Sequence, residues 1–201
     1  MTRWYQEKKQ EHFYKKAKKE GYRARSAYKL KQIQKKFNII SLGDTVVDLG
    51  AAPGGWSQVA KELVGNHGLI VGIDLQRIKP IEGIIFFKGD ITEPSSLTKI
   101  KQSIGSNGAQ VVISDMAPNI SGNYSIDHAQ SIYLCQQAFH VAEQLLANQG
   151  NFICKIFEGE LLAEFISTVK NRFNTIKRIS PQASRKSSSE LYLIGKSFIR
   201  S

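Results

Sequence analysis

Short apolar runs alternate with longer amphipathic stretches along the chain from Thr45 onward. A short apolar run bounded by turn residues indicates a buried strand, whereas apolar residues at every third or fourth position indicate a helix. The pattern predicts strands over residues 45–49, 69–74, 84–88, 110–114, 151–156, 174–179 and 190–198. Between them it predicts helices over residues 56–65, 95–104, 127–147 and 160–172.

The predicted strands are expected to form one sheet with helices on both faces. Runs such as Val111-Val-Ile-Ser114 are apolar throughout, as expected when both faces of a sheet are covered. The loop between the last two strands is too short for a helical crossover, so these strands should pair as an antiparallel hairpin. We therefore predict a single α/β, Rossmann-like domain with a seven-stranded, mostly parallel sheet and an antiparallel last strand.

Two helical segments are expected before the sheet. Residues 4–20 are rich in lysine and form either a helix or an arm that becomes ordered on binding. Gly21 interrupts this segment, and a second helix is expected over residues 26–37 with Ser26 as its N-cap. We predict that residues 1–36 form a basic extension and that residues 37–201 form the α/β domain.

The positive charge lies at the two ends of the chain. The formal net charge is +11, yet residues 1–36 hold 13 Lys and Arg against 3 acids, whereas residues 37–174 hold 9 against 13. This segregation favours a nucleic acid as a polyanionic partner, although a run of charge is often only a solvated face. We expect RNA and not DNA. The candidate RNA contacts are Lys15, Lys16, Lys18, Lys19, Arg23, Arg25, Arg185 and Lys186.

Cysteine content and hydropathy bear on the compartment. Cys135 and Cys154 are far apart in the sequence and indicate neither a disulfide framework nor a zinc site. No apolar run approaches the roughly 18 residues that a membrane helix needs, and the charged N-terminus lacks the apolar core of a signal peptide. We expect a cytoplasmic monomer that needs no membrane and no metal.

The segment Val46-Val-Asp-Leu-Gly-Ala-Ala-Pro-Gly-Gly-Trp-Ser57 joins a predicted strand to a predicted helix. A glycine turn at this junction is where doubly wound sheets bind nucleotides. The spacing of Gly50, Gly54 and Gly55 does not fit the dinucleotide pattern G-x-G-x-x-G, and no P-loop lysine follows. Asp48 would repel a pyrophosphate but suits a cationic ligand without phosphate, such as S-adenosylmethionine.

Four acids fall near the carboxyl ends of successive predicted strands, where open α/β sheets bind their ligands. They are Asp48, Asp74, Asp90 and Asp115. Asp74 is placed to accept from both hydroxyls of an adenosine ribose, and Asp90 to accept from the adenine amino group. Asp90 and Asp127 also suit helix N-caps. Trp56 either shields the methionine part of such a cofactor or packs in the core.

Lys155 is the strongest candidate for chemistry. It interrupts the apolar strand Phe152-Ile-Cys-Lys-Ile-Phe157, and lysine is rarely buried without a purpose. Burial favours the neutral amine, which can serve as a general base. The alternative is a lysine at a strand end whose amine reaches solvent.

From about Tyr14 to Ile194 the chain resembles the FtsJ/RlmE family of RNA 2′-O-ribose methyltransferases. The resemblance rests on Arg23-Ala-Arg-Ser-Ala-Tyr-Lys-Leu30, Val47-Asp-Leu-Gly-Ala-Ala-Pro-Gly-Gly-Trp56, Ser114-Asp-Met-Ala-Pro-Asn119 with Ser121-Gly122, Cys154-Lys-Ile-Phe157 and Ser184-Arg-Lys-Ser-Ser-Ser-Glu190. It implies the fold of the class I S-adenosylmethionine-dependent methyltransferases. It also implies a catalytic set, carried over to Lys29, Asp115, Lys155 and Glu190.

The resemblance further implies where the cofactor and the substrate bind. The family's cofactor contacts fall on Gly54, Trp56, Asp74, Asp90 and Asp115, and Asp48, Gly50, Pro53 and Gly55 complete the candidate cofactor site. The implied reaction transfers a methyl group from S-adenosylmethionine to a ribose 2′-hydroxyl, with Lys155 as general base and S-adenosylhomocysteine as product. The first implied substrate is a uridine in the A-loop of 23S-type large-subunit rRNA, in an assembled or assembling subunit.

Other functions remain as alternatives. The serine-rich loop before Glu190 resembles that of tRNA-modifying relatives, so the anticodon loop of tRNA is a second substrate. Cytosine C5 methylation would need a nucleophilic cysteine, and the side chain of Cys154 should point to the sheet face opposite Lys155. Amino methylation of bases would need an Asn/Asp-Pro-Pro-aromatic turn, where this chain has Asp115-Met-Ala-Pro118. A non-catalytic RNA-binding or ribosome-assembly factor is the alternative of a different class.

Overall fold

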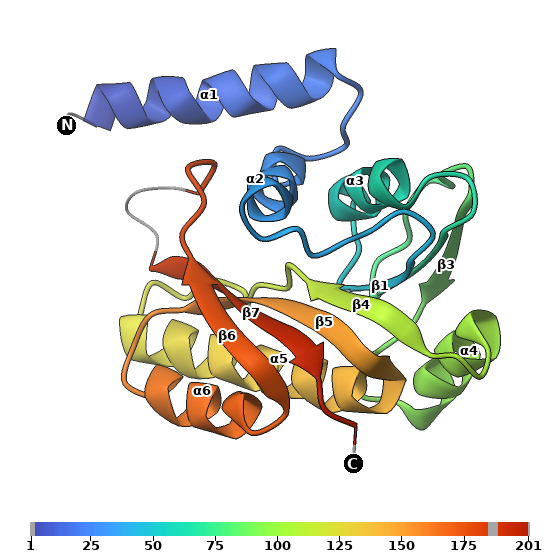
Figure 1. Cartoon of the computed structure of the whole chain (residues 1–201). Coiled ribbons are helices and arrows are strands. Elements are labelled where there is room, and N and C mark those ends of the chain that lie inside the picture. Colours follow the sequence, from blue (N-terminus) through green and yellow to red (C-terminus); the bar gives the residue numbers. More distant parts are fainter. Residues whose placement is uncertain (1–2, 185–188, 201) are drawn as a thin grey trace.

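The computed structural model describes residues 3–184 and 189–200. Within them, one sheet of seven strands runs in the order β3-β2-β1-β4-β5-β7-β6 (Figure 1). The strands are β1 (Thr45–Leu49), β2 (Leu69–Asp74), β3 (Ile84–Lys88), β4 (Ala109–Ser114), β5 (Leu146–Phe157), β6 (Phe173–Ile179) and β7 (Glu190–Phe198). β7 is antiparallel to β5 and β6, and the other pairs are parallel. The predicted sheet with a reversed last strand is confirmed.

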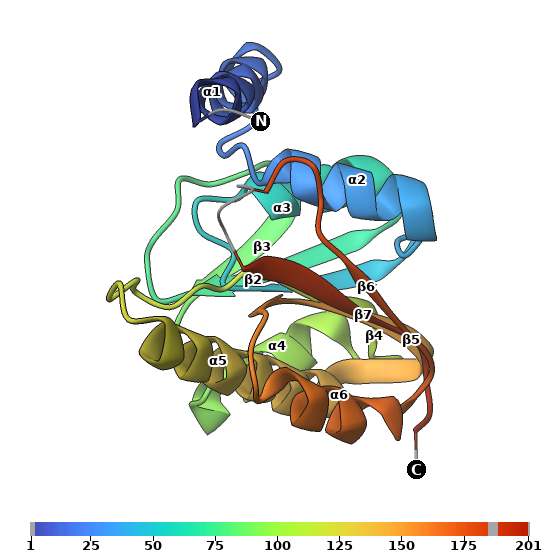
Figure 2. The ribbon, with the colours of Figure 1, turned by 90° about the vertical axis from the view of Figure 1, so that its left-hand side faces the viewer.

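Helices cover both faces of the sheet, as predicted. α4 (Pro94–Ile104), α5 (Tyr124–Leu145) and α6 (Leu162–Lys170) lie on one face, and α2 (Ala27–Phe37) and α3 (Gly55–Val64) lie on the other. Figure 2 shows the sheet between these two layers, with α1 (Arg3–Lys19) outside α2. No helix in the described part of the chain is long and apolar enough to span a membrane.

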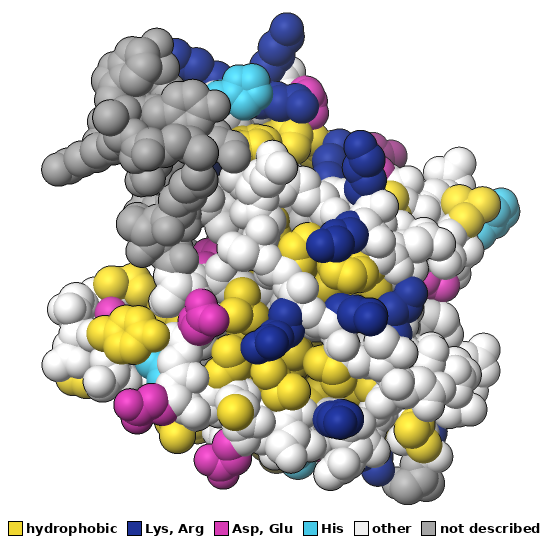
Figure 3. Space-filling view, turned by 60° about the vertical axis from the view of Figure 1, so that its left-hand side comes forward, with side chains coloured by type: hydrophobic (Ala, Val, Ile, Leu, Met, Phe, Trp, Pro, Cys, Tyr) yellow, Lys and Arg dark blue, Asp and Glu magenta, His cyan; other side chains and the backbone are white. Residues whose placement is uncertain are grey.

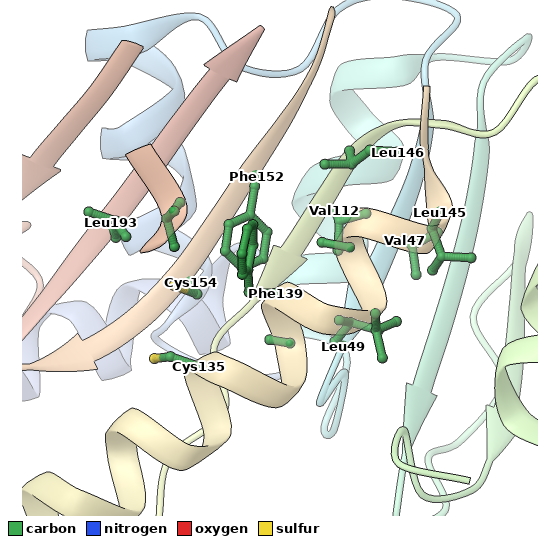
Figure 4. Packing of buried hydrophobic residues seen from close by; sticks show 14 of the residues in the cluster. Val47, Leu49, Val112, Cys135, Phe139, Leu145, Leu146, Phe152, Cys154 and Leu193 are labelled. Carbon is green, nitrogen blue, oxygen red and sulfur yellow. The ribbon is translucent and has the colours of Figure 1, made fainter. Parts of the chain in front are cut away.

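The sheet separates two apolar clusters. The cluster under α4, α5 and α6 includes Phe139 and Phe152, whose ring centroids lie 5.8 Å apart (Figure 4). The cluster under α2 and α3 includes Ile153 and Tyr192. Because successive strand residues point to opposite faces, Cys154 points toward α5, and the neighbouring Lys155 points toward α2. The expected direction of the Cys154 side chain is confirmed.

One predicted helix start is confirmed in position and another is wrong. Ser26 stands at the N-cap position of α2, as predicted, but its backbone angles are helical and its side chain makes no capping hydrogen bond. α5 begins earlier than residue 127, because the Asn123 side chain accepts from the backbone N–H groups of Ser125 and Ile126 at 3.1 and 3.3 Å. Asp127 is therefore inside the helix, and its carboxylate accepts from the N–H and the hydroxyl of Ser121.

Candidate active site

The glycine loop after β1 turns too tightly for side chains. Gly50 and Gly54 have φ angles of +75° and +110°, which L residues rarely adopt. A Cβ atom at Gly50 would collide with the side chain of Met116, and one at Gly54 would lie 2.6 Å from Ile81 Cδ1. The N–H of Gly50 donates to the carbonyl of Ile73 at 2.9 Å, which holds the loop against the end of β2.

Asp48 is a fully buried carboxyl group under this loop. Its Oδ2 accepts from the Ser57 hydroxyl at 2.6 Å, but its Oδ1 has no hydrogen-bond partner among the described residues. Burial, together with the smaller effect of the charges of Asp115 and Asp74, raises the pKa of Asp48 to about 7, and the hydrogen bond from Ser57 opposes this rise. A buried oxygen without a partner marks a place where a donor group of a ligand can bind.

Asp74 and Asp90 follow the next two strands. The two carboxylate oxygens of Asp74 accept from the N–H groups of Ala52 and Gln76 at 2.9 and 2.7 Å. Each of these oxygens can still accept a second hydrogen bond. Asp90 is not a helix N-cap, because Glu93 precedes α4, and its Oδ1 accepts from the N–H and hydroxyl of Thr92. This edge of the sheet therefore offers acceptors to a ligand rich in O–H and N–H donors.

Trp56, the second residue of α3, lies in the core. It is 3% exposed, and its indole N–H donates to the carbonyl of Ser26 at 2.9 Å. Its ring stacks on Tyr192 with 5.5 Å between the ring centroids. The residue thus fixes the segment before α2 against the glycine loop.

The structure brings the four predicted catalytic residues together as two ion pairs. Lys29 Nζ lies 2.6 Å from Glu190 Oε1. Lys155 Nζ donates to the Asp115 backbone carbonyl at 2.5 Å and to Asp115 Oδ1 at 3.0 Å. Both lysines are only 8% exposed, so the alternative in which Lys155 extends into solvent is excluded. Each buried ammonium group has a carboxylate partner, as burial of charge requires.

Tyr192 connects the two pairs. Its hydroxyl donates to Asp115 Oδ1 at 2.6 Å, and Lys29 Nζ lies 5.7 Å from the centroid of its ring. The side chain is fully buried. Burial, together with the charges of Asp115 and Glu190, raises the pKa of Tyr192 well above its ordinary value, so the hydroxyl stays protonated and remains a donor.

The sequence analysis did not identify Tyr192. The residue stands directly opposite Lys155 in the antiparallel pairing of β5 and β7, and two positions after Glu190 in β7. Residues two apart in a strand share a face. The alternation Glu190-Leu-Tyr192 therefore indicates that Tyr192 shares a face with Glu190. Only the register between β5 and β7 shows that it also lies opposite Lys155.

The predicted RNA contacts fall into three groups. Lys15, Lys16, Lys18 and Lys19 are exposed on α1. Arg23 and Arg25 are partly buried between α1 and α2, and the Arg23 guanidinium donates to the carbonyls of Pro53, Lys79 and Pro80 at 3.3, 2.5 and 2.8 Å. Arg185 and Lys186 lie outside the described residues. In Figure 3, Lys and Arg side chains run from the top of the face down through its centre, and several acidic side chains lie at the lower left.

Cys154 is unsuited to nucleophilic attack. It is 1% exposed on the α5 side of the sheet, and burial raises the pKa of its thiol well above the ordinary value. The reactive form of cysteine is the thiolate. Cytosine C5 methylation through this residue is therefore disfavoured.

The raised pKa of Asp48 makes the stability of the protein depend on pH. Between the ordinary pKa of 3.8 and the folded pKa of about 7, the folded chain keeps a proton that the unfolded chain releases. The free energy of unfolding should therefore fall by at most about 4 kcal/mol as the pH rises through this range. Asp48→Asn, which has no such proton to lose, should show a smaller fall in urea-unfolding titrations from pH 4 to pH 8.

Ser57→Ala is the matched variant, and it should change the pH dependence of stability in the opposite direction from Asp48→Asn. It removes the hydrogen bond that lowers the pKa of Asp48, so the loss of stability should extend to higher pH than in the wild type. If the wild-type and Asp48→Asn proteins lost stability in parallel across this range, Asp48 would not be the titrating group.

Comparison with known proteins identifies the family. The FtsJ-like methyltransferase family matches residues 22–198. Ribosomal RNA large subunit methyltransferase E of Methanosarcina mazei is 51% identical over 191 residues, which cover 95% of this chain and 70% of the relative. The same enzyme of Methanothrix thermoacetophila is 52% identical over 189 residues, which cover 94% of this chain and 73% of the relative.

Solved structures agree with this assignment. A Plasmodium falciparum protein described as a ribosomal RNA methyltransferase superposes with a TM-score of 0.82 at 29% identity, covering 90% of this chain and 100% of its own. The matched family range includes the glycine loop, both ion pairs and Tyr192. The chain belongs to the FtsJ-like methyltransferase family.

Proposed function

We propose that the protein transfers a methyl group from S-adenosylmethionine to the 2′-hydroxyl of a ribose in large-subunit rRNA. The observation that carries this proposal is the pair of buried lysine–carboxylate contacts, joined by Tyr192, at the end of the sheet that also holds the glycine loop. The relatives named ribosomal RNA large subunit methyltransferase E support rRNA as the substrate.

The residues after β1, β2 and β3 fit S-adenosylmethionine. The unpartnered Oδ1 of Asp48 and the remaining acceptor capacity of Asp74 and Asp90 suit the donors of an aminoacyl-adenosine cofactor. The tight turn at Gly50 and Gly54, against which the side chains of Met116 and Ile81 pack, holds the loop backbone at this end of the sheet. The bound cofactor would supply a methyl group on a sulfonium sulfur, which a ribose 2′-oxygen can attack.

Lys155 is the general base of this proposal. In the reactive form of this proposal the ammonium group of Lys155 has released a proton, which leaves an amine with two N–H donors and one lone pair. The two acceptors that Lys155 contacts, the carbonyl and the carboxylate of Asp115, match those two donors. The lone pair is then left to accept the proton of the 2′-hydroxyl as the oxygen attacks. Asp115 thereby orients the amine, because both of its contacts hold the nitrogen in one place.

Lys29, Glu190 and Tyr192 complete the site. Lys29 places a cation beside the reacting oxygen, where it can stabilise developing negative charge. Glu190 holds Lys29 in position and itself accepts from the hydroxyl of Ser184 at 2.8 Å. Tyr192 donates to the Asp115 oxygen that also contacts Lys155, which limits how far that carboxylate can move.

The exposed lysines of α1 are the proposed contacts to RNA phosphates. They position the RNA but do not read its sequence. A ribose within a duplex is hard to reach, which favours a nucleotide in a loop, such as the A-loop of an assembled or assembling subunit. The anticodon loop of tRNA is the other substrate that an assay must include. Two buried, unpaired cysteines are in keeping with the cytoplasm.

Lys155→Met should abolish methyl transfer and leave cofactor binding nearly intact. The substitution removes the base but keeps an unbranched side chain, and Asp115 retains Tyr192 as a donor. Labelled S-adenosylmethionine would be offered with large ribosomal subunits, free rRNA and tRNA in parallel, and ribose methylation mapped by resistance to alkaline cleavage. Lys88→Met, at the exposed end of β3, is the matched control and should transfer normally.

The results of this assay distinguish between the two candidate substrates and also test the role of Lys155. Transfer to rRNA or subunits by the wild type supports rRNA, whereas transfer to tRNA alone keeps the reaction and replaces the substrate. Near-normal turnover in Lys155→Met would remove Lys155 from the mechanism. Cofactor binding without transfer to any RNA would favour a non-catalytic role.

Tyr192→Phe should slow methyl transfer by about 10- to 100-fold, because one hydrogen bond to a charged acceptor contributes about 1.5–3 kcal/mol. The ring remains to stack on Trp56, so the fold and the cofactor affinity should change little. Single-turnover rates and cofactor titration measure the two effects, with Tyr133→Phe on the exposed side of α5 as the control. An unchanged rate would show that Asp115 needs no second donor.

Replacing Lys18 and Lys19 together with alanine should weaken RNA binding without changing cofactor affinity. Each lost phosphate contact should reduce the slope of log K against log salt by about 0.7 to 0.9. RNA affinity measured at several salt concentrations gives this slope. Lys99→Ala, exposed on α4, should leave it unchanged, and an equal slope in all three proteins would remove α1 from the RNA contact.

A further inference from the structure

Tyr124, the first residue of α5, presents an aromatic ring to solvent in a fixed orientation. The residue is 59% exposed. Its hydroxyl donates to the backbone carbonyl of Glu158 at 2.6 Å. One face of its ring stacks on His128, with ring centroids 6.4 Å apart and an angle of 12° between the planes. An exposed side chain that is held at both its face and its tip has little freedom left to lose on binding.

The support beneath Tyr124 is itself rigid. His128 is 5% exposed, and its Nε2 accepts from the N–H of Leu161 at 3.1 Å. The loop after β5 approaches this imidazole closely, since a Cβ atom at Gly159 would lie 2.6 Å from the ring. The outer face of Tyr124 is therefore left as a flat surface on an immobile base, which is the form of a stacking platform.

This platform is connected to the catalytic residues. Glu158, which accepts from Tyr124, donates its own N–H to the carbonyl of Ser189 at 2.8 Å, next to Glu190. Glu158 also follows directly after β5, three residues beyond Lys155, which corresponds to roughly 10 Å of extended chain. A nucleotide whose ribose lies at Lys155 would thus have its own base or that of its neighbour within reach of Tyr124.

We propose that Tyr124 stacks on an unpaired nucleobase of the substrate RNA beside the methylated ribose. The inference rests on the proposed function, because it needs RNA at Lys155. Presenting a ribose from a folded RNA requires a base to leave its stack, at a cost of a few kcal/mol. Stacking on Tyr124 would offset this cost, and it would do so for any base, since every base has an aromatic face.

The charge around Tyr124 favours a base over a phosphate as the occupant. Lys155 is the only Lys or Arg between Lys101 and Lys170, whereas Glu158 and Glu160 are exposed in the adjoining loop. Negative charge repels the RNA backbone but not an uncharged ring, so the backbone is expected on the α1 and α2 side.

The test compares Tyr124→Ala, Tyr124→Phe and Tyr133→Ala in methyl transfer to free rRNA and to large subunits. Loss of one base–aromatic stack should raise the KM for RNA by about 5- to 150-fold in Tyr124→Ala. Tyr124→Phe keeps the ring and should stay close to the wild type. Tyr133→Ala, which truncates another exposed tyrosine of α5, should match the wild type, as should the cofactor affinity of all three variants.

Two results would overturn the stacking proposal, and a third, which is distinguishable from both, would overturn the function on which it rests. If Tyr124→Phe is as impaired as Tyr124→Ala, the hydroxyl contact to Glu158 matters and stacking does not. If Tyr124→Ala is impaired on subunits but normal on free rRNA that the wild type methylates, the ring contacts a protein. If the wild-type enzyme methylates no RNA, the proposed function itself is wrong, and the wild-type assay alone shows this.

Discussion

Two ammonium groups buried between the sheet and α2 constrain much of this structure. A buried charge without a partner costs several kcal/mol, so each lysine must meet a carboxylate at hydrogen-bond distance. The Lys29–Glu190 pair ties α2 to β7, and the Lys155–Asp115 pair ties β5 to the end of β4. The residues proposed to carry out catalysis thus also hold α2, β7, β5 and the end of β4 together.

The segment between α1 and α2 is also fixed by hydrogen bonds, and these involve Arg23, which the sequence analysis proposed as an RNA contact. The guanidinium of Arg23 donates to carbonyls of the glycine loop and of the loop after β2, and its backbone N–H donates to Gln58 Oε1 at 2.9 Å. A basic run can therefore contain cations that serve the fold. The lysines of α1 precede this fixed segment in the chain, and the segment connects α1 to the proposed cofactor loop.

Sequence periodicity predicted the sheet, the reversed last strand and the positions of the acids, because these depend on local patterns. The role of Tyr192 could not be predicted, since it depends on the register that places this residue opposite Lys155. Ser26 stands at the N-cap position of α2 as predicted, but the sequence could not show that its side chain makes no capping hydrogen bond. A turn in which the Ala27 N–H donates to the carbonyl of Ala24 already gives Ser26 a helical backbone, and no side-chain cap is needed.

The cationic and aromatic surfaces on the two sides of Lys155 correspond to the phosphate and the base on the two sides of a ribose. The ribose joins a charged phosphate to an uncharged, flat base. An enzyme that acts on the ribose therefore gains from a cationic surface on one side of its reactive group and an aromatic surface on the other. The carboxyl end of β5 lies between the lysine-rich α1 and α2 on one side of the sheet and Tyr124, at the start of α5, on the other (Figure 2). The proposed phosphate contacts would carry no sequence information and the proposed stacking would accept any base, so together these two contacts would leave the selection of a single nucleotide to the folded shape of the RNA.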